Sequence, residues 1–64
     1  MDNEVTNLLD NMAEQFQEAL HDADKFTSGN NSAGTRVRKA MQNIKNLAQL
    51  VRLEVQEQKN SVLA

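Results

Sequence analysis

The sequence predicts an all-α fold, an antiparallel two-helix hairpin that self-associates into a dimeric four-helix bundle or a higher oligomer. Two segments carry apolar residues at alternating steps of three and four positions, the spacing of one face of a helix. The polar stretch SGNN, at positions 28–31, separates the two segments. Because a connection this short favours antiparallel neighbours, the two helices are expected to pair along their length.

The length of the chain limits what this fold can bury. Its 64 residues allow one domain at most, and we expect a single helical hairpin over residues 1–64. A chain of this size buries only about 60% of its unfolded surface, so a lone hairpin is expected to be marginally stable. Self-association is the least costly way for the chain to bury more apolar surface.

The first predicted helix runs from about residue 3 to about residue 26, and no proline or glycine interrupts it. Gly29 lies where a left-handed C-terminal cap is expected, so the turn is placed at about residues 27–31. The apolar stripe, which Leu8 and Leu20 widen, is expected to form the core, and its two phenylalanines are expected to be core residues. Its members are Val5, Leu9, Met12, Phe16, Ala19, Ala23 and Phe26.

The second predicted helix covers about residues 32–60. Asn30, Asn31 or Ser32 can serve as its N-cap, because each offers a side-chain oxygen to the first backbone amides. Ala40 and Leu47 broaden its stripe to the width expected of a bundle helix. The members of this stripe are Val37, Met41, Ile44, Ala48, Val51, Val55, Gln58 and Val62.

Two helices cannot enclose a core, and Leu50 and Leu53 fall outside the stripe of the second helix. A single hairpin would leave both side chains in water, whereas pairing two hairpins would cover more of each face. The residues expected at the interface of the oligomer are Phe16, Ile44, Leu47, Leu50, Val51 and Leu53.

Composition argues against catalysis. The chain has no cysteine, one histidine and two dispersed glycines, which excludes disulfides, thiolate metal sites and a glycine-rich phosphate loop. Glu18 and His21 have the Glu-x-x-His spacing of di-iron bundles, but in this register both lie on the outer face. We therefore predict no enzyme activity, no cofactor or metal, and no small-molecule substrate. No apolar run approaches the ~20 residues of a membrane span, so a cytoplasmic protein is expected.

Charge is divided sharply along the chain. Residues 1–24 hold seven acidic residues and no lysine or arginine, whereas residues 25–53 hold six basic residues and no acid. Such asymmetry indicates an electrostatic partner, either within the assembly or outside it.

Three basic residues, Arg36, Arg38 and Lys39, follow the turn. Cations in the first turns of a helix oppose its macrodipole, and a phosphate would reverse this penalty because amides at a helix N-terminus and guanidinium groups both favour it. A line of four cations at seven-residue intervals also follows the second helix: Arg38, Lys45, Arg52 and Lys59. The residues expected to bind nucleic acid are Lys25, Arg36, Arg38, Lys39, Lys45 and Arg52. The alternative is a structural or adaptor coiled coil whose cations bind an acidic protein.

The segment SGNNSAGTRVRKAMQNIKNLAQLVRLEVQEQKN resembles the helical domain of the bacterial linker-histone-like family first known from chlamydiae. Members of that family carry a Lys-Gly-Asn-like turn, then Ala-(Ala/Gly)-x-Arg-x-Arg, then a helix with Leu or Ile at heptad spacing. The acidic first segment matches only in its pattern. The matching residues are Gly29-Asn30, Ala33-Gly34-Thr35-Arg36-Val37-Arg38, and the stripe Ile44, Leu47 and Val51.

This resemblance implies a nucleoid-associated protein that binds the DNA backbone without strong sequence preference and aids chromosome compaction. It carries phosphate contact onto Arg36, Arg38 and Lys39. Many members of the family continue into a long Lys/Ala/Pro-rich tail, and a domain without that tail is expected to bind DNA weakly at physiological salt. The partners it implies are DNA and a tailed histone-like paralogue, beside further copies of this chain.

Overall fold

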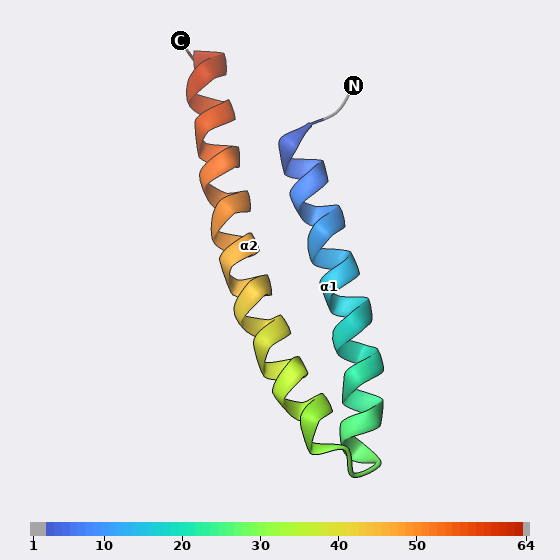
Figure 1. Ribbon diagram of the computed structural model, residues 1–64. Helices are drawn as coiled ribbons and strands as arrows, with labels where there is room; N and C mark the ends of the chain where they lie inside the picture. The colour runs from blue at the N-terminus through green and yellow to red at the C-terminus, as the bar shows by residue number, and fades with distance from the viewer. Residues whose placement is uncertain (1–2, 64) are drawn as a thin grey trace.

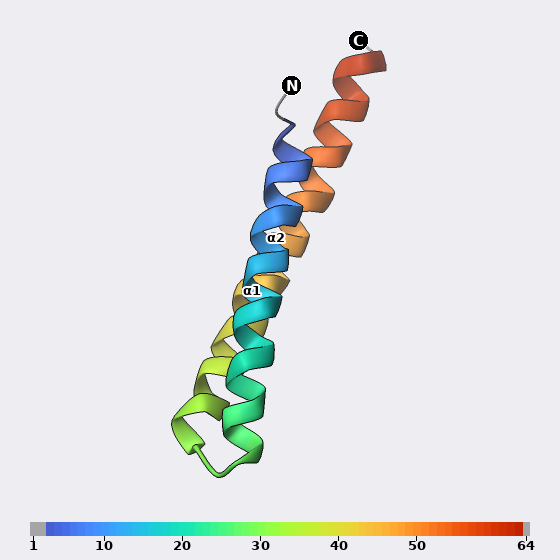
Figure 2. The same ribbon diagram turned by 90° about the vertical axis from the view of Figure 1, so that its right-hand side faces the viewer.

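The computed structural model describes residues 3–63, which form two helices side by side (Figure 1). Helix α1 spans Glu4–Thr27 and helix α2 spans Asn31–Leu63. The helices are antiparallel, with both chain ends at one end of the molecule and the turn at the other (Figures 1 and 2). The predicted all-α class is confirmed, since the described residues contain no strand. Helix α2 continues past the predicted end at about residue 60.

The first turn of α1 is capped by the residue that precedes it. Asn3 has an extended backbone, and its side-chain oxygen accepts a hydrogen bond of 2.8 Å from the amide of Val5. Such a cap satisfies one of the amides that have no partner within the helix. Glu4, in the first turn, adds a favourable charge at the positive end of the helix dipole.

The turn between the helices is a Schellman motif centred on Gly29. Gly29 has a φ of +105°, the left-handed region that glycine enters without a steric penalty. Its amide donates to the carbonyl of Phe26, and the amide of Asn30 donates to the carbonyl of Lys25, both at 3.0 Å. These two bonds satisfy carbonyls at the end of α1 in the pattern of that motif. The predicted left-handed cap is confirmed.

Helix α2 begins immediately after this turn. Of the three candidate N-caps, Asn30 takes the role, because its side-chain oxygen accepts a hydrogen bond of 3.1 Å from the amide of Ala33. One residue thus closes the turn through its own amide and starts the next helix through its side chain. The connection is short because these two tasks are combined.

The packing between the helices is thin. The Cα trace measures 54 × 20 × 10 Å, which is one helix thick in its narrowest direction. Three of the four buried residues, among those that the structure describes, are alanines, and no large side chain is fully buried. Ala33 is completely covered, so the two backbones approach closely near the turn. The buried residues are Ala19, Ala33, Ala40 and Ile44.

The seam between the helices is rotated from the one that the sequence predicts. Every second member of each predicted stripe is retained as far as Ala19 on α1 and Gln58 on α2. The residue before each of the others moves into the seam, as Leu8 replaces Leu9 and Ala40 replaces Met41, while Ala23 and Ala48 stay half-buried beside it. The seam consists of Val5, Leu8, Met12, Gln15, Ala19 and Asp22 on α1, and of Ala33, Val37, Ala40, Ile44, Leu47, Val51, Glu54 and Gln58 on α2. The predicted stripe member Val62 has a side chain outside the described part.

The phenylalanines are therefore not core residues, contrary to the prediction. Phe16 is 48% exposed and Phe26 is 50% exposed. The physical reason is the close approach of the helices at the buried alanines, which leaves no room for a ring between the two axes. Phe26 instead covers Gly34 across the turn, where a Cβ atom would lie only 2.6 Å from the Cδ1 atom of the ring.

Polar bonds hold both ends of the seam. At the open end the side chains of Asn3 and Gln58 exchange two hydrogen bonds, of 3.2 and 3.1 Å. Near the turn Arg36 donates through Nε to Oδ1 of Asp22 at 3.0 Å. These contacts fix which residues of the two helices lie at the same level.

One side of the hairpin carries an apolar strip that the seam does not cover. In an antiparallel pair of right-handed helices, the residue after a seam position points to the same side of the hairpin in both helices. Five large side chains there are between 38% and 62% exposed, and we call them the open apolar face: Leu9, Phe16, Leu20, Met41 and Val55. Leu50 and Leu53 precede seam positions and are exposed on the opposite side.

Candidate nucleic-acid interface

The six basic residues that were expected to bind nucleic acid do not form one cluster. Arg38, Lys45 and Arg52 each follow a seam residue and lie on the side of the open apolar face. Arg36 and Lys39 each precede a seam residue and lie on the opposite side, and Lys25 lies in the last turn of α1. Residues two positions apart in the chain, such as Arg36 and Arg38, therefore lie on different sides of the hairpin because of the helical repeat.

Arg36 is occupied within the hairpin. Its Nε lies 3.0 Å from Oδ1 of Asp22, a seam carboxylate whose side chain is only 17% exposed, while the Arg36 side chain is 48% exposed. This is the one ion pair among the residues that the structure describes. The pair ties α2 to α1 near the turn, so a phosphate would have to compete with a carboxylate that is already in place.

The turn end of α2 also differs from the expected phosphate site. Because α2 begins at Asn31, Arg36, Arg38 and Lys39 lie in its second and third turns, and the effect of the macrodipole fades within the first turn. The amide of Ala33 is satisfied by Asn30. The three cations are therefore not unfavourably placed with respect to the helix dipole. The first amides of α2 and these cations also do not converge on one point, so the expected phosphate site is not formed.

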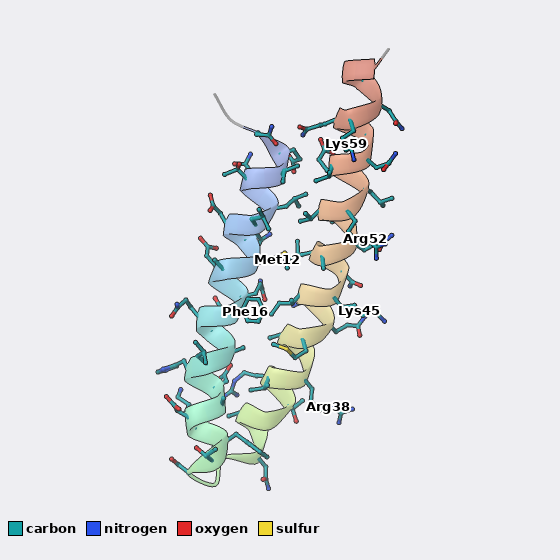
Figure 3. The ribbon with its side chains drawn as sticks, turned by 180° about the vertical axis from the view of Figure 1, so that it is seen from behind. Met12, Phe16, Arg38, Lys45, Arg52 and Lys59 are labelled. Atoms are coloured by element: carbon teal, nitrogen blue, oxygen red, sulfur yellow. The ribbon has the colours of Figure 1, made fainter. Side chains whose placement is uncertain are left out.

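What the structure does present is a straight row of cations on α2. We call it the basic row: Arg38, Lys45, Arg52 and Lys59. Figure 3 shows these four side chains one above another along α2, on the side from which Phe16 is also seen. All four residues are exposed, and none forms an ion pair within residues 3–61.

The row has a regular spacing that suits separate phosphates. Seven residues of helix rise about 10 Å, so the row extends over about 32 Å, close to one turn of duplex DNA. Lys59 completes this row although it was not among the six residues expected to bind nucleic acid. The seven-residue interval from Arg52 places it in the same line in the sequence.

The rest of the surface offers little other chemistry. Glu18 and His21 are both exposed on α1, and within the described residues no three side chains of the metal-binding types come together. In the same part of the chain, neither helix is long and apolar enough to cross a membrane. The candidate oligomer residues divide between surfaces: Ile44, Leu47 and Val51 belong to the seam inside the hairpin, and the other three are exposed.

Fold and row together define a small helical-hairpin protein with a cationic edge on its second helix. The chain belongs to the family described as Histone H1-like protein Hc1, whose model matches residues 6–61. No curated protein and no solved structure matches the chain. The resemblance inferred from the turn and the second helix is confirmed, and the match extends over most of α1 as well.

Proposed function

We propose that this protein is a histone-like, nucleoid-associated protein that binds DNA through the phosphate backbone and without reading base sequence. The observation that carries the proposal is the basic row, four exposed cations at seven-residue intervals with no acidic partner within residues 3–61. Membership of the histone H1-like family supports the choice of DNA as the ligand.

The row is suited to phosphates rather than to base edges. Arginine and lysine are the side chains that contact phosphate oxygens most often, and such contacts position a protein on the duplex without carrying sequence information. Specific readout needs Asn, Gln or Arg side chains to converge on the edges of neighbouring bases. Side chains about 10 Å apart on one helix cannot converge in that way.

The acidic residues of α1 limit how the hairpin can approach DNA. Residues 1–24 carry only negative side-chain charges, so the duplex must meet the α2 edge. With four cations in the row, few counterions are released on binding. The logarithm of the binding constant is therefore expected to fall with the logarithm of the salt concentration by at most about 0.9 per phosphate contacted. Binding is therefore expected to be measurable at low salt and weak at physiological salt.

We also infer that the protein acts as an oligomer. The open apolar face exposes large side chains on a hairpin that buries none of them fully, and small monomeric domains seldom leave such a strip in water. An oligomer multiplies the number of rows, which strengthens backbone binding and allows more than one stretch of duplex to be held. Compaction of the chromosome follows from the second effect.

Fluorescence anisotropy of a random-sequence duplex at low and physiological salt tests the DNA proposal. The variant Lys45→Gln/Lys59→Gln removes two cations of the row, and its matched control, Lys25→Gln/Lys39→Gln, removes two cations elsewhere. We expect the row variant to bind at least tenfold more weakly at low salt with a smaller salt slope, and the control to bind nearly as the parent does. A second random duplex should give the same parent affinity.

The opposite results have distinct meanings. No binding by the parent at low salt would overturn the proposal and leave the adaptor with an acidic protein partner as the better interpretation. Equal losses in the row variant and its control would show that net charge alone, and not the row, determines binding.

A further inference from the structure

We propose that the open apolar face is covered by a second copy of this chain, related by a two-fold axis that runs along the hairpin. In this arrangement α1 of one copy lies on α2 of the other, and both turns are at the same end. The inference specifies the self-association proposed above and does not depend on DNA binding. It rests on the apolar strip and on the position of charges along its two edges.

The face is apolar in its middle and charged along one edge. Leu9, Phe16 and Leu20 on α1 lie on the same side of the hairpin as Met41 and Val55 on α2, and each is at least 38% exposed. On α2 the strip is bordered by the basic row. Figure 3 shows the four members of the row along α2, in a view in which Phe16 is also seen, on α1. A second hairpin stacked on this face would bury these side chains as a bundle core, which the single hairpin lacks.

The border on α1 carries a second regular series. Asn3, Asp10, Gln17 and Asp24 recur every seven residues. The last three lie on the outer side of α1, away from α2 of the same chain, whereas Asn3 is the N-cap residue, and its side chain is hydrogen bonded to Gln58 of α2. Two of the four are carboxylates, and all of the described ones are exposed. Acidic and basic edges of the hairpin therefore have the same period.

The two series also have matching levels. Asn3 lies level with Gln58, to which it is hydrogen bonded. Because the helices are antiparallel, moving seven residues forward along α1 and seven back along α2 gives the next matching pair. Asp10 therefore lies level with Val51, the neighbour of Arg52. Phe26 lies level with Gly34, which it covers. Asp24 is accordingly level with Arg36, half a turn from Arg38.

A two-fold axis along the hairpin does not change the level of any residue. Residues that are level within one chain are therefore also level between the two copies. Arg52 of one copy then faces Asp10 of the other, and Arg38 faces Asp24. Arginine can lay its aliphatic part over apolar surface while its charged end reaches a carboxylate beyond, and Ala13 and Leu20 are the residues of α1 that it would cross. Each pair of hairpins forms two such edges, with two ion pairs on each.

The other two-fold arrangement is disfavoured by charge. An axis across the hairpin would place α1 on α1 and α2 on α2, so that the basic rows of both copies would run side by side. Juxtaposed like charges are penalised across interfaces. A symmetric dimer uses the same patch on both copies, and only the axis along the hairpin makes this patch electrostatically self-complementary.

The proposed pairing leaves half of the basic row for phosphate. Lys45 faces the uncharged Gln17 of the second copy, and Lys59 lies at the level of its uncharged Asn3, so neither charge is neutralised. The two-fold axis puts the two rows on opposite sides of the pair. If the proposed DNA binding holds, one pair of hairpins can contact two stretches of duplex.

A charge-exchange experiment tests the pairing without DNA. One chain carries Asp10→Lys/Asp24→Lys and the other carries Arg38→Glu/Arg52→Glu, and each is studied alone and in an equimolar mixture by sedimentation equilibrium, native mass spectrometry and circular dichroism. We expect each chain alone to associate at least tenfold more weakly than the parent. The mixture should form a heterodimer as strong as the parent dimer, because every reversed charge meets an opposite one.

The mixture keeps the test decisive even if a single variant does not fold, since recovery of helicity on mixing is itself the expected result. The matched control, Glu14→Lys/Glu18→Lys, changes the charge of α1 equally at positions further round the helix. Mixed with Arg38→Glu/Arg52→Glu, it should give no such heterodimer. The pairing is overturned if the reversed chains associate as the parent does, if mixing restores nothing, or if the control rescues equally. A monomeric parent at micromolar concentration would overturn self-association itself.

Discussion

Gly29 is the residue on which the turn depends. Its φ of +105° lies in a region that side chains with a Cβ atom avoid, yet the space around the missing Cβ is open within 4 Å. The requirement for glycine is therefore one of backbone conformation and not of packing. Both Schellman hydrogen bonds rely on this conformation, since they join residues on either side of it.

Gly29→Val is expected to lower the free energy of unfolding by about 2 kcal/mol, because a β-branched residue resists positive φ. Urea unfolding followed by circular dichroism measures the change. Gly29→Asn is the control, since asparagine tolerates left-handed conformations better and should cost less. Equal stability of the valine variant and the parent would contradict the assigned turn.

At the scale of the helices, the contact between Phe26 and Gly34 joins the end of α1 to the beginning of α2. A glycine inside a helix costs roughly 1 kcal/mol relative to alanine. The presence of Gly34 directly after the buried Ala33 therefore implies a packing reason. The ring of Phe26 provides it, since a Cβ at Gly34 would lie 2.6 and 2.7 Å from two ring carbons.

Gly34→Ala is accordingly expected to give no gain in stability, and to lose up to about 2 kcal/mol, because displacing the ring offsets the improved helix propensity. In a Phe26→Ala background the same substitution should instead stabilise the protein by about 1 kcal/mol. Thermal unfolding of the four proteins in this cycle measures the coupling. Identical effects of Gly34→Ala in both backgrounds would show that the ring does not restrict this position.

At the scale of the whole molecule, the apolar residues divide into those that hold the hairpin together and those that the hairpin leaves exposed. Ile44 is buried in the seam, with 9% of its surface exposed, whereas 48% of Phe16 is exposed on the open apolar face. Both were expected at an oligomer interface. The structure gives Ile44 a role within one chain, and only Phe16 retains a surface for a partner.

Ile44→Ala should lower stability by about 2 kcal/mol or more at every protein concentration, because it removes seam packing within the hairpin. Phe16→Ala should have an effect that grows with concentration, because it acts through association, which stabilises by mass action. Thermal unfolding over a hundredfold range of concentration separates the two. A concentration-independent loss in Phe16→Ala would place Phe16 in the hairpin core after all.

Much of the site could be predicted because its elements are local. The intervals between Arg38, Lys45 and Arg52 follow from the helical repeat alone, so the row was visible before the helices were placed. The residues that lie next to each cation in space could not be predicted in this way. That Arg36 meets Asp22, fourteen residues earlier, depends on where the turn folds α2 back against α1. Only the tertiary structure therefore shows that Arg36 is paired with a carboxylate within the hairpin.

By itself the sequence determined that the chain forms two helices, where they are capped, and that Gly29 turns between them, because capping and helix formation involve residues at most five positions apart. Only the tertiary structure decided which side of each stripe faces the other helix. Both apolar stripes are wider than the contact between two helices, so periodicity permits several rotations. The fit of Ala33 and Ala40 at close approach selects the rotation that leaves Phe16 outside.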